Sequence, residues 1–128
     1  MPKTVLIVED NEVNQLVTTG MLRRLGYTSE IAADGHSALE KLGSKRYGVV
    51  LMDMQMPILD GIDATREIRA LKLARQPWII ALTANVQPEQ VQRCREAGMD
   101  GHVGKPIQVS TLLGALGAAL TPDDSVDG

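Results

Sequence analysis

Acidic, hydroxyl and ammonium side chains stand at the points where apolar runs of this chain end. Glu9 and Asp10 follow the first run, and Asp53 follows a later one. Thr83 and Lys105 close two further apolar segments. Carboxylates can hold a cation or attack as nucleophiles, and a lysine beside them can bind the oxygens of an anion. These five residues form a candidate chemical site if the fold brings them together.

Short apolar runs and helical segments alternate along the chain. Runs rich in Val, Ile and Leu predict strands, and apolar residues spaced three or four apart predict helices. Strands are expected at 4–8, 28–32, 48–52, 78–82 and 101–104. Helices are expected at 13–25, 37–42, 62–71, 88–97 and 109–120. Gly26 and Gly98 are expected to end the first and fourth helices, and Pro88 suits the first turn of the fourth.

This alternation predicts an α/β fold. Right-handed crossovers place helices on both faces of a parallel sheet, whose strands are then continuous apolar runs. The predicted architecture is a flavodoxin-like, doubly wound sheet of five parallel strands in the order 2-1-3-4-5, with five helices. Ligands bind such sheets outside the carboxyl ends of the strands, where the first and third strands are neighbours. Glu9, Asp10 and Asp53 are therefore expected to converge there.

Length and composition indicate one domain. The chain has 128 residues, of which 44% are hydrophobic, and we expect a folded domain at 1–120 and a flexible acidic tail or linker at 121–128. A net charge of −3 without a basic stripe excludes a nucleic-acid footprint. The single cysteine, Cys94, suits a reducing compartment. Neither a signal-peptide pattern nor an apolar span of about twenty residues is present, so a cytoplasmic domain without membrane contact is expected.

A cluster of three carboxylates calls for a cation, because like charges repel one another. Mg²⁺ suits oxygen ligands and retains several waters. With the ion present, Asp53 could act as a nucleophile toward a phosphoryl group whose oxygens are bound by Lys105 and by the hydroxyl of Thr83.

Five short motifs resemble those of a known family, the receiver domains of two-component response regulators. The amino-acid sequences of the first two motifs given below are most similar to those of receivers within hybrid histidine kinases. The motifs are Val8-Glu9-Asp10-Asn11, Leu51-Met52-Asp53-Met54-Gln55-Met56-Pro57, Asp60-Gly61, Leu82-Thr83-Ala84 and Lys105-Pro106.

The resemblance implies transfer of a phosphoryl group to Asp53 from the phosphohistidine of a histidine kinase or a histidine phosphotransfer domain. It implies Mg²⁺ held by Asp10, Asp53 and the backbone carbonyl of Gln55, with Glu9 assisting. It also implies a cis bond between Lys105 and Pro106, a form that X-Pro bonds adopt at modest cost. The chain is then a phosphoprotein of signal transduction and not an enzyme, with at most self-catalysed phosphorylation and dephosphorylation.

The resemblance also implies a route for the signal. The family has Tyr or Phe three residues before the lysine, and that ring swings inward as the threonine moves. This chain has His102 there, so Thr83 and His102 are the candidate switch residues. The output face is expected to combine the segments 88–97, 101–104 and 109–120, and its partner is either another protein or a second copy of this chain.

Three alternatives compete with this interpretation. An aspartyl-phosphate phosphatase of the haloacid-dehalogenase type needs a second Asp two residues after the nucleophile, where this chain has Gln55. A flavodoxin-like flavin-binding domain needs a hydroxyl- and glycine-rich loop where this chain has Glu9 and Asp10. A pseudo-receiver that is never phosphorylated would usually lack Asp53, Asp10 or Lys105.

Overall fold

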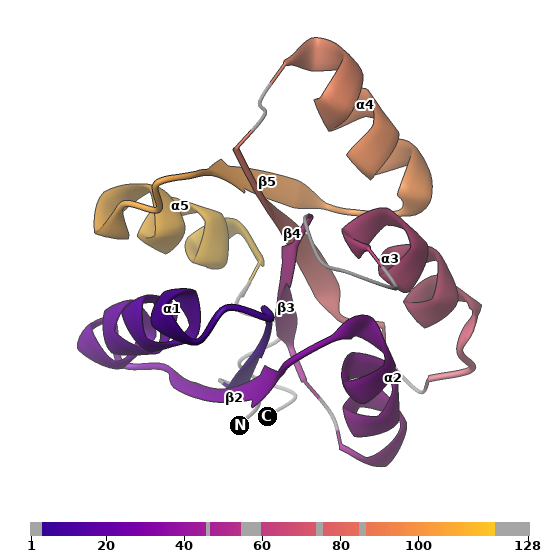
Figure 1. The fold of residues 1–128 in the computed structure, drawn as a ribbon, viewed down its shortest axis with the longest axis horizontal. Helices are drawn as coiled ribbons and strands as arrows, with labels where there is room; N and C mark the ends of the chain where they lie inside the picture. Colours follow the sequence, from indigo (N-terminus) through magenta and orange to yellow (C-terminus); the bar gives the residue numbers. More distant parts are fainter. Residues whose placement is uncertain (1–3, 46, 55–59, 74–75, 85–86, 120–128) are drawn as a thin grey trace.

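The structure is a computed structural model that describes residues 4–45, 47–54, 60–73, 76–84 and 87–119. Across these residues, five strands and five helices alternate (Figure 1). The strands are β1 (Thr4–Val8), β2 (Thr28–Ala32), β3 (Val49–Asp53), β4 (Trp78–Thr83) and β5 (Gly101–Gly104). The helices are α1 (Glu12–Arg24), α2 (Gly35–Ser44), α3 (Gly61–Ala70), α4 (Pro88–Ala97) and α5 (Val109–Ala119).

The strands form one parallel sheet in the order β2-β1-β3-β4-β5, which confirms the predicted topology. Val8 at the end of β1 lies opposite Met52 in β3, so these two strands finish side by side. Their carboxyl ends point to the same edge of the sheet. The residues that follow β1 and those that end β3 are therefore neighbours.

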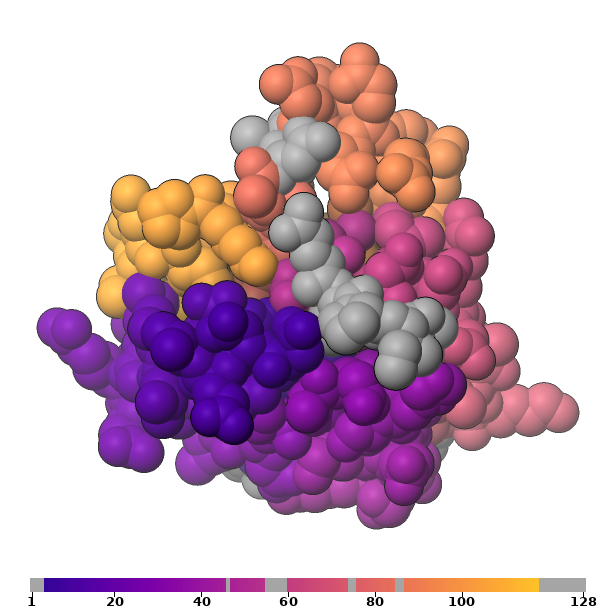
Figure 2. All heavy atoms as spheres, viewed as in Figure 1, coloured from indigo at the N-terminus to yellow at the C-terminus, as the bar shows by residue number. Residues whose placement is uncertain are grey.

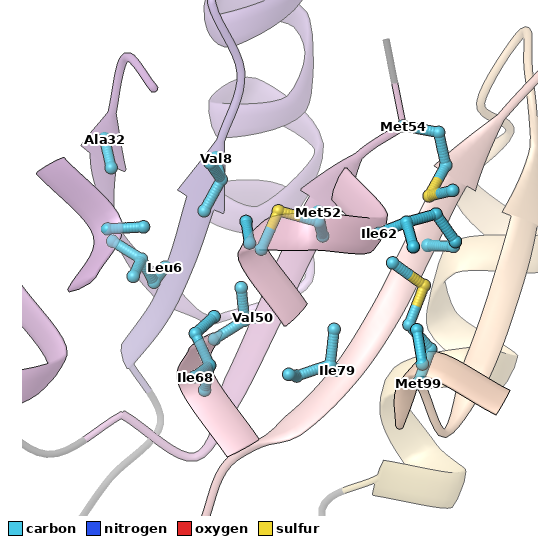
Figure 3. Close-up of a cluster of buried hydrophobic side chains, with 14 of the residues drawn as sticks. Leu6, Val8, Ala32, Val50, Met52, Met54, Ile62, Ile68, Ile79 and Met99 are labelled. Carbon is cyan, nitrogen blue, oxygen red and sulfur yellow. The ribbon is translucent and has the colours of Figure 1, made fainter. Parts of the chain in front are cut away.

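Helices cover both faces of the sheet. In Figure 1, α1 and α5 lie on one face, and α2, α3 and α4 lie on the other. Successive residues of β3 serve the two faces in turn, because side chains alternate along a strand. Val50 and Met52 belong to the hydrophobic cluster under α2, α3 and α4, part of which Figure 3 shows, whereas Val49 and Leu51 belong to the cluster under α1 and α5. Burial on both faces explains the continuous apolar runs.

Polar side chains begin three of the helices at the carboxyl edge of the sheet. Asn11, Asp34 and Asp60 are the N-caps of α1, α2 and α3. The side-chain oxygen of each accepts a hydrogen bond from the backbone N–H three residues further on, at 3.0, 2.8 and 2.9 Å respectively. These caps stabilise sharp turns from strand to helix, and such turns keep the edge compact.

The ends of α4 follow the prediction from sequence. Pro88 lies in its first turn, and Gly98 is its C-cap with a φ of 111°, a left-handed conformation that glycine adopts without strain. Gly26, after α1, also has a positive φ of 89°. The predicted stop signals of both helices are confirmed.

Two strands end one residue later than predicted. β3 includes Asp53 and β4 includes Thr83, whereas the prediction ended these strands at 52 and 82. Asp53 pairs with Leu82, and Thr83 pairs with Gly104, so backbone pairing continues through the polar residues. Because they belong to the sheet, Asp53 and Thr83 are held more rigidly than loop residues would be.

The predicted bounds of three helices also need adjustment, and one of them is α1, which covers Glu12–Arg24 instead of the predicted 13–25. α2 covers Gly35–Ser44, longer than the predicted 37–42, because the Asp34 cap starts it two residues earlier. α3 starts at Gly61, one residue before the predicted start. Position 120 and the tail predicted at 121–128 lie outside the described residues.

The apolar spacing that predicts α1 includes Met21 and Leu25, which pack against the core, and three residues that are exposed. Val13, Leu16 and Val17 are 66%, 73% and 49% exposed, and we call these three residues the α1 stripe. The residue of α1 that is buried in the core is Leu22. The spacing of the stripe identified the helix correctly but not the side that faces the sheet.

Among the described residues, no helix combines the length and the apolar character needed to cross a membrane.

Candidate functional site

Three carboxylates meet at the carboxyl ends of β1 and β3. Asp53 ends β3, and Glu9 and Asp10 directly follow β1. One carboxylate oxygen from each residue lies within 4.8 Å of the others. Glu9 and Asp53 are buried, whereas Asp10 is exposed. The convergence predicted from the strand order is confirmed, and Asp10 provides the cluster with an opening to solvent.

The predicted lysine and threonine complete the site. The Nζ atom of Lys105 lies 2.8 Å from Oδ1 of Asp53, forming a salt bridge with the buried carboxylate. The backbone N–H of Lys105 donates to the carbonyl of Thr83 at 2.8 Å, which connects the end of β5 to the end of β4. Thr83 is buried. The bond between Lys105 and Pro106 is cis, as the resemblance implies.

Two amide side chains that sequence reasoning did not assign to the site hold Glu9. Nδ2 of Asn14 donates to Oε1 of Glu9, and Nε2 of Gln15 donates to the backbone carbonyl of Glu9, both at 2.6 Å. The backbone N–H of Glu9 donates to the carbonyl of Ala32 at 3.0 Å. The signal in the sequence is a pair of amides on the first turn of the helix that follows the acidic pair.

The Glu9 carboxyl has a strongly shifted pKa. Burial, together with a hydrogen bond and charge repulsion involving Asp53, raises the pKa of Glu9 from 4.5 to about 7. The hydrogen bond from Asn14 and the charge of Lys105 act in the opposite direction. A carboxyl with a pKa near 7 lies close to its midpoint of ionisation at neutral pH, so a cation could readily displace its proton.

The acidic cluster fits a hard divalent cation. All three side chains offer carboxylate oxygens, the donors that Mg²⁺ prefers. Among the described residues, the buried Oε2 atom of Glu9 receives no hydrogen bond, although a buried acceptor normally has a donor. An ion or its bound water would satisfy this atom. The predicted fourth ligand, the carbonyl of Gln55, lies outside the described residues.

His102, the predicted switch residue, lies away from the carboxylates. It stands on β5 opposite Ala81, and its side chain is exposed. With Val91 and Arg95 of α4, it lines a small hollow between that helix and β5. The structure therefore places His102 on the predicted output face, and its part in switching stays a prediction.

A pocket of about 220 Å³ lies beside the site, between α1 and the segment that follows β5. Its lining joins Glu9 and Lys105 of the site to Val17 of the α1 stripe and to Pro106 and Ile107. In Figures 1 and 2, α1 and α5 lie next to each other on this side of the molecule. The α1 stripe is therefore continuous with a hollow that leads to the carboxylates.

Similar proteins have been identified by sequence. Hybrid signal transduction histidine kinase A of Dictyostelium discoideum is 40% identical over 119 residues, which cover 89% of this chain and 6% of that protein. Histidine kinase 5 of Arabidopsis thaliana is 34% identical over 138 residues, covering 88% of this chain and 15% of that protein. This chain corresponds to a small part of these relatives.

Solved structures show the same fold. The receiver domain of a Pseudomonas aeruginosa sensor histidine kinase, which has a magnesium ion coordinated in its active site cleft, is 42% identical with a TM-score of 0.85. That match covers 94% of this chain and 98% of the other. A chemotaxis response regulator of Vibrio cholerae is 32% identical with a TM-score of 0.85, covering 91% of this chain and 98% of the other.

The family model described as the response regulator receiver domain matches residues 5–117. This match covers all five strands and the complete acidic cluster. It favours a receiver over the haloacid-dehalogenase and flavodoxin alternatives. The chain is similar to the receivers of hybrid histidine kinases, and it belongs to the response regulator receiver domain family of two-component signalling.

Proposed function

We propose that this chain is a phosphoryl-accepting signalling domain in which Asp53 receives a phosphoryl group from a phosphohistidine. The observation that carries the proposal is the environment of Asp53. Its buried carboxylate lies against the Nζ atom of Lys105, and it shares the cluster with Glu9 and Asp10. A carboxylate held between a cationic group and a candidate metal site is suited to attack phosphorus.

In the proposed reaction, one carboxylate oxygen of Asp53 attacks the phosphorus atom of the donor. A P–O bond forms to Asp53 while the P–N bond of the phosphohistidine breaks. The electron pair of that bond stays with the imidazole nitrogen, which binds a proton. The product is an acyl phosphate on Asp53. Because phosphoryl transfer depends mainly on alignment and charge stabilisation, the attacking oxygen must be held in place, and its position in β3 does this.

The residues around Asp53 would stabilise the incoming charge. We propose that Asp10, Asp53 and the carbonyl of Gln55 hold Mg²⁺, with Glu9 assisting. When bound, the ion supplies positive charge that offsets the repulsion between the carboxylates and the phosphoryl oxygens. Lys105 is close enough to exchange its contact with Asp53 for one with a phosphoryl oxygen.

The proposed output route begins at Thr83 and Lys105. The hydroxyl of Thr83 would bind a phosphoryl oxygen, and the shift would pass to α4, β5 and α5, with His102 as the candidate second switch residue. The exposed Gly114 and Gly117 leave open space on α5, where a Cβ would meet no atom within 4 Å. A partner helix or a second copy of the chain could approach that helix closely.

The proposed phosphodonor protein docks on the α1 stripe. A row of apolar side chains at positions i, i+3 and i+4 presents one exposed helix face, and exposed apolar patches mark interaction sites. Through Val17 this row is continuous with the pocket that reaches Glu9 and Lys105. A histidine kinase or phosphotransfer domain seated on the α1 stripe would bring its phosphohistidine to the mouth of the site.

The remaining expectations about the whole chain are part of this proposal. We propose a receiver unit at 1–120 with a flexible acidic tail or linker at 121–128. The unit acts in the cytoplasm and carries out no catalysis beyond its own phosphorylation and dephosphorylation. The lone cysteine, Cys94, is buried, and a chain with one cysteine suits a reducing compartment.

The deciding experiment measures phosphorylation by intact-mass spectrometry. Incubation with Mg²⁺ and acetyl phosphate should add one phosphoryl group to the wild type and none to Asp53→Asn. Asp60→Asn is the matched control, because Asp60 caps α3 outside the acidic cluster. This control should be labelled like the wild type. Equal labelling of Asp53→Asn would refute the assignment, and an unlabelled wild type would instead support a pseudo-receiver.

The same assay tests the docking surface. Leu16→Glu should be labelled normally by acetyl phosphate but slowly by a histidine-phosphorylated phosphotransfer domain, because only the protein donor needs the α1 stripe. Glu40→Gln, an exposed change on α2, should affect neither donor. Equal rates from the protein donor with Leu16→Glu and with the wild type would exclude this surface.

A further inference from the structure

The side chain of Asn14 makes a contact that the phosphorylation chemistry does not by itself require. Asn14 stands on an exposed part of α1, yet its amide turns inward and donates to Oε1 of Glu9 at 2.6 Å. The other carboxylate oxygen of Glu9 is buried and receives no hydrogen bond from the described residues. The two oxygens of one carboxylate therefore stand in different environments.

The surrounding backbone fixes where the Asn14 amide lies. Oδ1 of Asn11 accepts from the backbone N–H of Asn14 at 3.0 Å, and the carbonyl of Asn11 accepts from the backbone N–H of Gln15 at 2.9 Å. These bonds place Asn14 on the first turn of α1. On the other side, the Glu9 backbone is held by Ala32 and by the side chain of Gln15. With both backbones fixed, the rotation of the Glu9 carboxylate is the main freedom left.

We propose that Asn14 is a positioning residue that orients the Glu9 carboxylate toward the metal site. By occupying Oε1, its amide leaves Oε2 to the acidic cluster, where an ion or its bound water would be the partner. This inference rests on the proposed function, because it assumes that the cluster binds Mg²⁺. Asn14 acts through Glu9 and need not touch the ion or the phosphoryl group.

The orientation matters because Glu9 is buried. A free carboxylate could turn about its bonds and present either oxygen to the cluster, or neither. Partners that fix metal-ligating side chains typically change metal affinity by about 10–100-fold when they are removed. Loss of the Asn14 amide should therefore weaken Mg²⁺ binding by about tenfold or more, while Asp53, Asp10 and Lys105 stay in place.

The test is an Mg²⁺ titration of the intact chain, followed by the amide NMR shifts of Glu9, Asp10 and Met54. Asn14→Leu removes the donor at similar volume and should weaken Mg²⁺ binding about tenfold. Asn14→Gln retains an amide donor and should recover much of the affinity. Val13→Ala is the matched control, because Val13 lies beside Asn14 on the same turn of α1 and its side chain is exposed. It should bind Mg²⁺ like the wild type.

The rate of phosphorylation is a second readout, which distinguishes a loss of Glu9 orientation from a general disruption of the site. At saturating Mg²⁺, Asn14→Leu should be phosphorylated by acetyl phosphate at nearly the wild-type rate, because the amide affects the occupancy of the site and not the attack by Asp53. If Asn14→Leu does not fold, Asn14→Ala takes its place with the same expectations. Thermal unfolding without Mg²⁺ identifies such a failure.

The outcomes distinguish this inference from the proposed function. If the wild type binds Mg²⁺ and Asn14→Leu binds it equally well, the positioning inference is wrong and the proposed function stands. Equal weakening in Asn14→Leu and Val13→Ala would also overturn it, because the effect would then come from the helix as a whole. If the wild type shows no Mg²⁺ binding, the proposed metal site itself fails.

Discussion

The three carboxylates of the acidic cluster differ in their exposure to solvent, and this difference affects how readily each one ionises. Glu9 and Asp53 are buried at the ends of neighbouring strands, whereas Asp10 faces solvent. Burial penalises the charged form of a carboxyl group, and a neighbouring carboxylate adds repulsion. Lys105 offsets part of this charge through its salt bridge with Asp53. The site therefore holds unfavourable charge in the absence of a cation.

The buried Glu9 carboxyl should make the stability of the domain depend on pH. Its pKa is about 7 in the folded protein and about 4.5 when unfolded, so the folded state binds more protons between these values. Stability from this group is present in full below pH 4.5 and is lost as pH rises through 7. Without Mg²⁺, the free energy of unfolding should fall over this range by up to roughly 3 kcal/mol.

Urea denaturation at several pH values measures this effect. Glu9→Gln cannot ionise at this position and should lack the decline, whereas Glu40→Gln should retain it. Mg²⁺ should reduce the decline in the wild type, because the ion replaces the proton. A wild-type profile that matches that of Glu9→Gln would contradict the assignment.

At the scale of elements, the turn from β3 into α3 packs against Asp53, the proposed phosphoacceptor. Gly61 begins α3 immediately after the Asp60 cap. A Cβ atom at Gly61 would lie 2.6 Å from the backbone oxygen of Asp53 and 3.0 Å from Sδ of Met54. The first residue of the helix thus packs directly against the backbone of Asp53. Only a residue without a side chain fits here unless the backbone shifts.

The packing predicts opposite effects for two Gly→Ala substitutions. Gly61→Ala should destabilise the domain by roughly 1–3 kcal/mol, because the neighbouring atoms are backbone and core. Gly114→Ala, within α5, should stabilise it by about 0.5–1 kcal/mol, because the new methyl group meets no atom within 4 Å and alanine favours helices. Denaturant midpoints of the two variants decide this. Equal midpoints would show that the turn can relax around the methyl group.

At the scale of the whole molecule, the site and the proposed output face share two strands. β4 ends at Thr83, and β5 ends one residue before Lys105. A backbone hydrogen bond joins Thr83 and Lys105. At the opposite end of the same strands, Arg69 of α3 donates to the carbonyl of Gly98 and to the carboxylate of Asp100. This clamp fixes the C-terminal end of α4. Movement of α4 is therefore expected mainly at its N-terminal end, nearest to Thr83.

Hydrogen exchange of the whole domain tests this prediction. Phosphorylation or beryllofluoride should change protection in the N-terminal half of α4, in β5 and in α5, as a shift in population between two existing packings. The Lys105→Ala variant, phosphorylated with acetyl phosphate, is the control. It should accept the phosphoryl group without transmitting the change. Protection changes confined to the acidic cluster would exclude the α4, β5 and α5 face as the output surface.

The sequence by itself determined the elements and which polar side chains the fold brings together at one edge of the sheet. Continuous apolar runs ending in Asp53 and Thr83 predicted buried parallel strands, because both faces of such strands are covered. The strand order then placed Glu9 and Asp10 beside Asp53, and the five motifs pointed to the family. These inferences succeeded because local spacing and chain connectivity fix them.

Only the tertiary structure decided which way side chains face and what holds them. The apolar spacing of α1 predicted a helix, but the α1 stripe points to solvent, because the face of a helix that is buried depends on its rotation over the sheet. The hydrogen bond from Asn14 to Glu9 depends on how the Asn11 cap sets the start of α1 beside the end of β1. The raised pKa of Glu9 comes from burial and from Asp53, which is distant in sequence. Spacing along a chain carries neither the rotation of a helix nor the dielectric environment of a carboxylate, because both arise only when separate elements pack together.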